Sequence, residues 1–148
     1  AGGSAGGYPS VGSRAVAAVP AGAATADGAE PYSPERLSEL RAAGTPVFLN
    51  MTAAWCITCL VNERVALADR SVLDTFERAG VVYMKGDWTQ RDDRITRLLA
   101  DFGRSGVPLY VLFSPGAEPH VLPQMLTPAL VAEAVSARVL SPFTDVKE

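Results

Sequence analysis

The residues of this sequence best suited to chemistry are its two cysteines, Cys56 and Cys59, which are separated by two residues in the stretch AAWCITCL. Such a pair can ligate a metal, form a structural disulfide or act as a redox couple. A closed zinc site needs about four ligands, and the chain adds only one histidine, His120, far along the sequence. A metal site within one chain is therefore not expected, although a site shared between two chains stays open.

The short loop between the cysteines argues against a purely structural cross-link. A disulfide stabilises a protein more as the loop that it closes lengthens, and this loop contains only Ile57 and Thr58. A C-x-x-C spacing close to a strand–helix–strand pattern is instead typical of redox pairs. The sequence thus favours a thiol–disulfide couple over the other two uses.

The cysteine pair follows an apolar, strand-like run at residues 46–52 and opens a helical pattern. One helical turn brings positions i and i+3 to about 5–6 Å, within reach of a disulfide. At a helix N-terminus, free N–H groups and the helix dipole favour a thiolate. We therefore expect Cys56 to be the nucleophile and Cys59, one turn later, to resolve the mixed disulfide.

The elements that must position the pair alternate between helical and strand-like patterns. Helices are predicted at 33–44, 60–69, 70–80, 89–103 and 127–140, and strands at 46–52, 81–88, 108–113 and 120–124. Ser33, Thr89 and Thr127 are the expected N-caps. The first half forms a strand–helix–strand unit with parallel strands. The second half forms a hairpin, and Pro123 favours an edge position for its last strand. The prediction is an α/β fold with a four-stranded mixed sheet flanked by helices on both faces.

Composition divides the 148 residues into a linker and one domain. Gly and Ala fill 17 of the first 30 positions, and such a segment buries too little apolar area to offset its ordering entropy. Residues 1–32 are therefore predicted to be a flexible linker, either a tether or plain disorder, and residues 33–148 the domain. The net charge of −3 without a basic run argues against nucleic acid. No run approaches the ~18 apolar residues of a membrane span, so we do not expect this segment to insert into a membrane. We also expect the domain to be a monomer.

Several stretches resemble a known family. AAWCITC after an apolar strand, with SGVP before a later strand, resembles the thioredoxin superfamily. This resemblance implies a thioredoxin-like fold and a cis peptide bond at Pro108 facing the cysteines. The backbone of Val107 would then pair with an extended substrate strand. NMTAAWCITCLVNE, VVYMKGDWT and FGRSGVPLY narrow the resemblance to the C-terminal periplasmic domain of the DsbD family, including its ScsB branch.

The resemblance implies a thiol–disulfide oxidoreductase, specifically a protein-disulfide reductase domain tethered to the inner membrane in the periplasm. Its partners would be a transmembrane electron-donor domain, in the same or another chain, and periplasmic thioredoxin-like acceptor proteins. The two thiols store both electrons, so no diffusible cofactor is expected. The alternatives are a free-standing thioredoxin or disulfide oxidase, and a redox-inert thioredoxin-like binding module. The Ile-Thr pair between the cysteines lacks a thiolate-stabilising histidine, which argues against a strong oxidant.

Residues around the pair partly match the family and partly depart from it. Trp55 matches an aromatic residue that shields the site, and Trp88 is expected to cover the core near a helix start. Glu63 matches an acidic position, where a carboxylate would raise the pKa of the cysteines, unless it is only a solvated charge. Asn50 replaces an acidic residue of some relatives and cannot shuttle a proton. Leu60 replaces a lysine of many relatives, so it either packs in the core or offers partners an apolar docking point.

Overall fold

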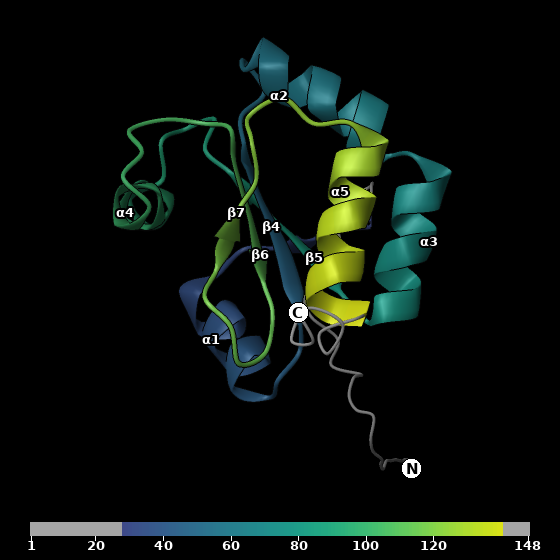
Figure 1. Ribbon diagram of the computed structural model, residues 1–148. Helices are drawn as coiled ribbons and strands as arrows, with labels where there is room; N and C mark the ends of the chain where they lie inside the picture. The colour runs from purple at the N-terminus through teal and green to yellow at the C-terminus, as the bar shows by residue number, and fades with distance from the viewer. Residues whose placement is uncertain (1–27, 141–148) are drawn as a thin grey trace, which may run out of the picture.

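The computed structural model describes residues 28–140, which form a mixed five-stranded sheet with helices on both faces (Figure 1). The strands lie in the order β3, β5, β4, β6, β7. Their bounds are Glu30–Pro31 for β3, Val47–Thr52 for β4, Val82–Asp87 for β5, Leu109–Phe113 for β6 and His120–Val121 for β7. The predicted α/β class, with helices flanking a mixed sheet, is confirmed.

The fifth strand, β3, is the part of the sheet that the sequence did not predict. Glu30 of β3 lies opposite Met84 of β5 in a parallel pair, and both Glu30 carboxylate oxygens accept hydrogen bonds from the Arg36 guanidinium at 2.8 and 3.0 Å. A strand of two residues is too short to show an alternating pattern of apolar and polar residues, and β3 therefore falls within the linker predicted at 1–32. The rest of that segment, residues 1–27, lies outside the described part of the chain.

The central strand, β4, joins the two halves of the molecule. It pairs in parallel with β5 and antiparallel with β6, so the predicted strand–helix–strand unit is confirmed. Its crossover contains α2 (Ile57–Asn62), a π-helical turn η1 (Glu63–Leu67) and α3 (Arg70–Ala79). The predicted hairpin is also confirmed, because β6 and β7 are antiparallel and β7 lies at the edge, ending before Pro123.

Two of the three predicted N-cap residues cap their helices in the structure. The side chains of Ser33 and Thr127 cap α1 (Pro34–Ala42) and α5 (Pro128–Val135), as predicted, and α5 continues into a π-helical turn η2 (Ser136–Leu140). The prediction for α4 (Asp93–Asp101) is wrong, because its N-cap is Asp92 rather than Thr89. The Thr89 hydroxyl instead donates to the Asp87 carboxylate and accepts from the backbone N–H of Ala54. The Asp92 carboxylate accepts from the first turn of α4 in its place.

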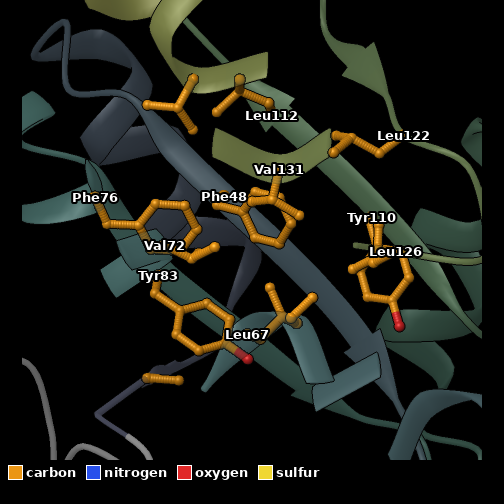
Figure 2. Close-up of a cluster of buried hydrophobic side chains, with 13 residues drawn as sticks. Phe48, Leu67, Val72, Phe76, Tyr83, Tyr110, Leu112, Leu122, Leu126 and Val131 are labelled. Carbon is orange, nitrogen blue, oxygen red and sulfur yellow. The ribbon is translucent and has the colours of Figure 1, made fainter. Parts of the chain in front are cut away.

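Two apolar clusters hold the sheet between its helices. Figure 1 shows α3 and α5 side by side on one side of the sheet, with α1 and α4 on the other. On the α3–α5 side, Phe48 of β4 packs against the rings of Phe76, Tyr83 and Tyr110 at centroid distances of 5.3 to 6.3 Å (Figure 2). On the other side, alternate β4 residues join leucines of α1 and α4 in a second cluster. Burying each large apolar side chain contributes roughly 1.5–3 kcal/mol, so β4 is fixed from both faces.

No helix within residues 28–140 is long and apolar enough to cross a lipid bilayer.

Candidate functional site

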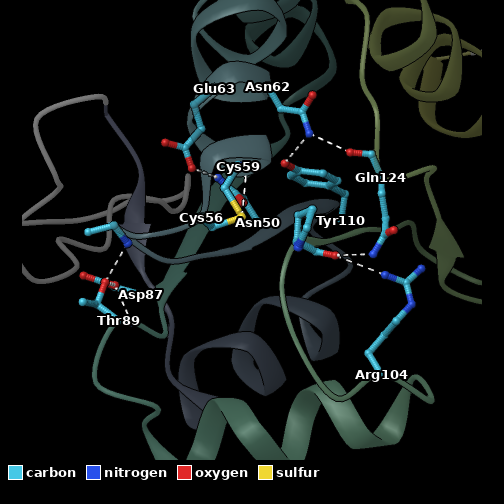
Figure 3. The surroundings of a disulfide bond; sticks show 12 residues. Asn50, Cys56, Cys59, Asn62, Glu63, Asp87, Thr89, Arg104, Tyr110 and Gln124 are labelled. Atoms are coloured by element: carbon cyan, nitrogen blue, oxygen red, sulfur yellow. Dashed lines mark hydrogen bonds between the residues drawn. A yellow bond between two sulfur atoms is a disulfide. The ribbon is translucent and has the colours of Figure 1, made fainter.

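The two cysteines form a disulfide at the point where β4 gives way to α2 (Figure 3). Their Cα atoms lie 5.3 Å apart. Cys56 is the N-cap of α2, and its Sγ accepts a hydrogen bond from the backbone N–H of Cys59 at 3.2 Å. Cys56 is 8% exposed whereas Cys59 is fully buried. Cys56 is thus the more exposed of the two cysteines, as expected for the nucleophile.

The loop before β6 faces the disulfide. The Val107–Pro108 peptide bond is cis, as the resemblance implied, and Val107 packs against the cluster of Ala53, Cys56 and Cys59. The carbonyl oxygen of Pro108 accepts hydrogen bonds from Arg104 Nη1 at 3.1 Å and Gln124 Nε2 at 3.4 Å. These bonds fix the loop from two sides, one from the segment after α4 and one from the segment after β7.

A buried polar group lies beneath the turn of α2 that carries Cys59. The side chain of Asn50 on β4 is fully buried, and its Nδ2 donates to Glu63 Oε2 at 3.1 Å and to the Tyr83 hydroxyl at 3.0 Å. Glu63 Oε1 also lies 3.7 Å from Lys85 Nζ, and the side chain of Glu63 is only 18% exposed. Glu63 is therefore a paired, largely buried carboxylate one turn after Cys59, rather than a solvated charge.

The oxygen of the Asn50 side chain stands apart from this network. Asn50 Oδ1 has no hydrogen-bond partner within the protein, and the same holds for Thr52 Oγ1, two residues further along β4 on the same face. Alternation along a strand places both atoms under α2. Within residues 28–140, these two atoms are the buried side-chain nitrogen or oxygen atoms that lack a hydrogen-bond partner. Leaving such an atom unpaired costs about 1–3 kcal/mol.

A second polar link, which the sequence did not suggest, ties α2 to the segment after β7. The buried Asn62 side chain donates from Nδ2 to the Tyr110 hydroxyl at 2.9 Å and to the Gln124 carbonyl oxygen at 2.7 Å. Its Oδ1 accepts from the backbone N–H of Leu126 at 3.1 Å. Burial raises the pKa of Tyr110 to about 12, which the Asn62 bond opposes and the Glu63 charge reinforces. An asparagine among apolar helix positions is the only local sign of this link.

The segment just before Cys56 is fastened to the loop between β5 and α4. The backbone N–H of Ala54 donates to Thr89 Oγ1 at 2.8 Å, and the indole N–H of Trp55 donates to the Thr89 carbonyl oxygen at 3.1 Å. Asp87 in turn accepts from the Thr89 backbone N–H at 2.9 Å. Thr89 is thus a site residue that was predicted only as a helix cap. Trp88 is buried and donates to Thr96 of α4, so its predicted place near a helix start is confirmed.

Leu60 and His120 lie in different surroundings. Leu60 is 38% exposed, and with Ala53, Ala54 and Glu63 it lines a cavity of about 650 Å³ beside the active-site loop. It is therefore not a core residue.

His120 lies on the edge strand β7 opposite Leu112, where partial burial and the charge of Arg138 lower the pKa of its imidazole.

The chemistry of this arrangement is thiol–disulfide exchange. It offers a disulfide between a slightly exposed cysteine and a fully buried one, and a carboxylate–amide pair below the helix turn that carries them. Within residues 28–140 no group of three or more His, Cys, Asp or Glu side chains is arranged to hold a metal ion.

Known proteins share this architecture. The thioredoxin-like family matches residues 29–115 of the chain. The Thiol:disulfide interchange protein DsbD 1 of Pseudomonas aeruginosa is 34% identical over 82 residues, which make up 55% of this chain and 14% of that protein. The oxidised C-terminal domain of Neisseria meningitidis DsbD superposes with a TM-score of 0.56 at 20% identity, covering 67% of this chain and 85% of that one. Chloroplastic thioredoxin z superposes with a TM-score of 0.57 at 21% identity, covering 76% and 95%.

These similarities differ in what they establish. The two superposed structures show a shared thioredoxin-like fold, which confirms the predicted fold. The similarity to the Pseudomonas protein is one of sequence over 82 residues of this chain, and it spans only 14% of that protein's length.

Proposed function

The chain belongs to the thioredoxin-like family and carries the cysteine pair of a thiol–disulfide oxidoreductase, and on that premise we propose that it is a protein-disulfide reductase domain. In this role it relays electrons from a membrane-embedded donor domain to protein disulfides outside the cytoplasm. The acceptors are periplasmic thioredoxin-like proteins. The observation that carries the proposal is the Cys56–Cys59 disulfide at the start of α2, in which Cys56 is 8% exposed and Cys59 is fully buried.

The exchange conserves electrons and atoms. In the reduced domain, the Cys56 thiolate attacks one sulfur of the partner disulfide and releases the other partner sulfur as a thiolate. Cys59 then loses its proton and attacks Cys56 Sγ, which forms the Cys56–Cys59 disulfide and releases the second partner thiolate. Two electrons pass to the partner, whose thiolates take up two protons. The donor domain reverses the same steps to reduce Cys56 and Cys59 again.

Glu63 is the residue best placed to tune these steps. It lies one turn after Cys59 on a continuous helix, and residues at this spacing are neighbours on a helix surface. Its carboxylate is held by Asn50 and Lys85. A nearby negative charge disfavours a thiolate, so Glu63 moderates the reactivity of the pair. Asn50 orients Glu63 without itself taking a proton.

The direction of electron flow and the location of the domain rest on the similarity to DsbD 1. A periplasmic domain tethered to the inner membrane fits this similarity. Val107, beside the cis bond and packed on the cysteine cluster, is placed to offer its backbone to an extended partner segment. In this proposal Leu60 also contacts the partner, which its partial exposure and its place in the lining of the adjacent cavity support.

A trapping experiment tests the proposal. The Cys59→Ser variant, fully reduced and mixed with a protein disulfide such as insulin, should accumulate a covalent adduct that dithiothreitol reverses. The matched control, Cys56→Ser, should form none, because the remaining Cys59 sulfur is buried. Release of reduced insulin by Cys59→Ser as fast as by the parent would contradict the two-step mechanism. A parent chain that reacts with neither insulin nor a small aromatic disulfide would reject the reductase function itself.

A further inference from the structure

Arg91 contacts both the aromatic residue that precedes the nucleophile and a second, neighbouring indole. The guanidinium carbon of Arg91 lies 4.9 Å from the centre of the Trp55 ring and 4.8 Å from that of the Trp88 ring. The two indoles themselves are 6.0 Å apart at an interplanar angle of 53°. One cation therefore contacts two π-faces, and each such contact is worth about 0.5–1 kcal/mol at an exposed site.

Of the two indoles, Trp88 is the fixed one. It is 4% exposed, its Nε1 donates to Thr96 Oγ1 at 2.9 Å, and its backbone N–H donates to the Thr52 carbonyl oxygen at 2.7 Å. Trp55, by contrast, is 47% exposed and has one side-chain hydrogen bond, to Thr89. Arg91 thus connects an anchored ring to an exposed ring that directly precedes Cys56 in the chain.

The backbone of Arg91 is in an unfavourable conformation. Among the non-glycine residues of 28–140, Arg91 alone has a positive φ angle, 56°, and L-residues are disfavoured in this left-handed region. Its N–H closes a tight turn onto the Trp88 carbonyl oxygen at 2.8 Å. Glycine or asparagine would make the same turn at lower cost. The turn alone therefore does not account for an arginine, whereas the two ring contacts do.

We propose that Arg91 is a positioning residue for disulfide exchange, because its guanidinium holds the Trp55 indole against Trp88 as a fixed apolar wall beside Cys56. A partner segment that docks across Cys56 meets this wall on one side and the Val107 loop on the other. Arg91 does not touch the reacting sulfurs. It acts through Trp55, so it affects how readily a folded partner presents its disulfide more than the intrinsic reactivity of Cys56. This inference rests on the proposed reductase function.

The test compares Arg91→Gln, Arg91→Lys and the control Arg97→Gln. The control removes the same charge from an exposed position on α4. For Arg91→Gln we expect kcat/KM with insulin to fall by about fivefold to thirtyfold, the range that two lost cation–π contacts give. The rise in KM should account for most of the loss. Reaction with a small aromatic disulfide should change less than twofold. Arg91→Lys should be intermediate, because an ammonium lacks the planar group that stacks on a ring.

A spectroscopic readout separates positioning from a general effect on folding. Acrylamide should quench tryptophan fluorescence more strongly in Arg91→Gln than in the parent, because the exposed Trp55 is the ring released. The far-ultraviolet circular dichroism couplet of the Trp55–Trp88 pair should weaken. Arg97→Gln should match the parent in both measurements.

Two results would overturn the role of Arg91. One is an Arg91→Gln variant with parental quenching and parental kcat/KM for insulin. The other is a variant whose melting temperature falls while insulin and the small disulfide slow to the same extent, which would indicate loss of structure alone. A parent chain inert toward both disulfides is a different outcome, since it rejects the reductase function as well as any role for Arg91 in it.

Discussion

The two faces of strand β4 are built from different chemistry. On one face, Val47, Leu49 and Met51 are all fully buried among apolar side chains of α1 and α4. The other face begins with Phe48 in the aromatic cluster and then presents Asn50 and Thr52 beneath the disulfide helix. The first face is uniform along its length, whereas the second changes from apolar to polar as it approaches the cysteines.

This difference separates stability from reactivity along a single strand. The apolar face has only packing to contribute. The mixed face contains both of the buried, unpaired side-chain atoms found within residues 28–140, Asn50 Oδ1 and Thr52 Oγ1. A protein tolerates such atoms at a cost in stability, and they concentrate where a site needs polar groups. Substitutions on the two faces should therefore affect different measurements.

The largest expected effect is on the apolar face. Leu49→Ala should lower the free energy of unfolding by about 3–5 kcal/mol, because truncating a buried leucine removes transfer energy and leaves a cavity. Urea denaturation would measure the loss. The rate at which iodoacetamide labels Cys56 in the reduced, folded protein should stay within twofold of the parent rate. A tenfold change in labelling with little loss of stability would break the distinction between the faces.

A somewhat smaller effect is expected at Tyr110, which borders the mixed face. Its pKa is raised to about 12 by burial, against about 10 in an unfolded chain. Below pH 10 the hydroxyl is neutral in both states, so its contribution to stability is complete. Above pH 10 the unfolded chain loses this proton first, and stability falls until the pH passes about 12. At about 1.4 kcal/mol per pKa unit, the loss is about 3 kcal/mol.

Tyr110→Phe isolates that contribution. The variant loses the hydrogen bond from Asn62 at every pH, but it should lack the additional fall between pH 10 and 12 that the parent shows. Denaturation midpoints measured across this range give the comparison. Parallel curves for parent and variant would mean that the Tyr110 hydroxyl does not titrate as its burial requires.

A third prediction concerns reactivity on the mixed face. Glu63→Gln removes the carboxylate beneath the Cys59 turn and keeps a side chain of similar shape. A carboxylate disfavours a neighbouring thiolate, so its removal should lower the pKa of the reactive thiol. The pH profile of iodoacetamide labelling should move to lower pH, with unfolding changed far less than in Leu49→Ala. An unmoved profile would assign Glu63 to structure alone.

The smallest effect is expected at Thr52. Its hydroxyl is buried without a hydrogen-bond partner within the protein, so Thr52→Val replaces an unpaired polar group by a methyl group of the same shape. The variant should be as stable as the parent or up to about 1 kcal/mol more stable. A loss of stability comparable to that of Leu49→Ala would show that the Thr52 hydroxyl forms a hydrogen bond in solution, and that the mixed face contains one unpaired atom fewer.

The parts of the fold predicted correctly are those with a local signal. The strands β4 and β5 each begin with three apolar residues, and Ser33 and Thr127 precede helical patterns as capping residues, so each could be assigned from a short window of sequence. Thr89 shows the limit of that reasoning. It precedes a helical pattern too, but its hydroxyl bonds Ala54 from another part of the chain, and a contact of that kind overrides a local capping preference.

The site divides in the same way. The cysteine pair and the Gly-Val-Pro turn were recognisable because both are short motifs. The surroundings of Glu63 were not recognisable. Asn50 lies 13 residues before Glu63, and Tyr83 lies 33 residues after Asn50. Asn62 and Tyr110 are 48 residues apart. No local pattern of residue types links groups so distant in sequence, and only the packing of α2 onto the sheet brings them together.

The sequence alone determined that the two cysteines form a couple at a helix start after a buried strand, because a spacing of three residues and an apolar run are local properties. The tertiary structure decided which groups surround that couple. It placed β3 on the edge of the sheet, paired Glu63 with Asn50 and Lys85, and brought Arg91 against the rings of Trp55 and Trp88. Each of these depends on long-range approach of chain segments, and the free energy of that approach comes from the whole core rather than from any one stretch.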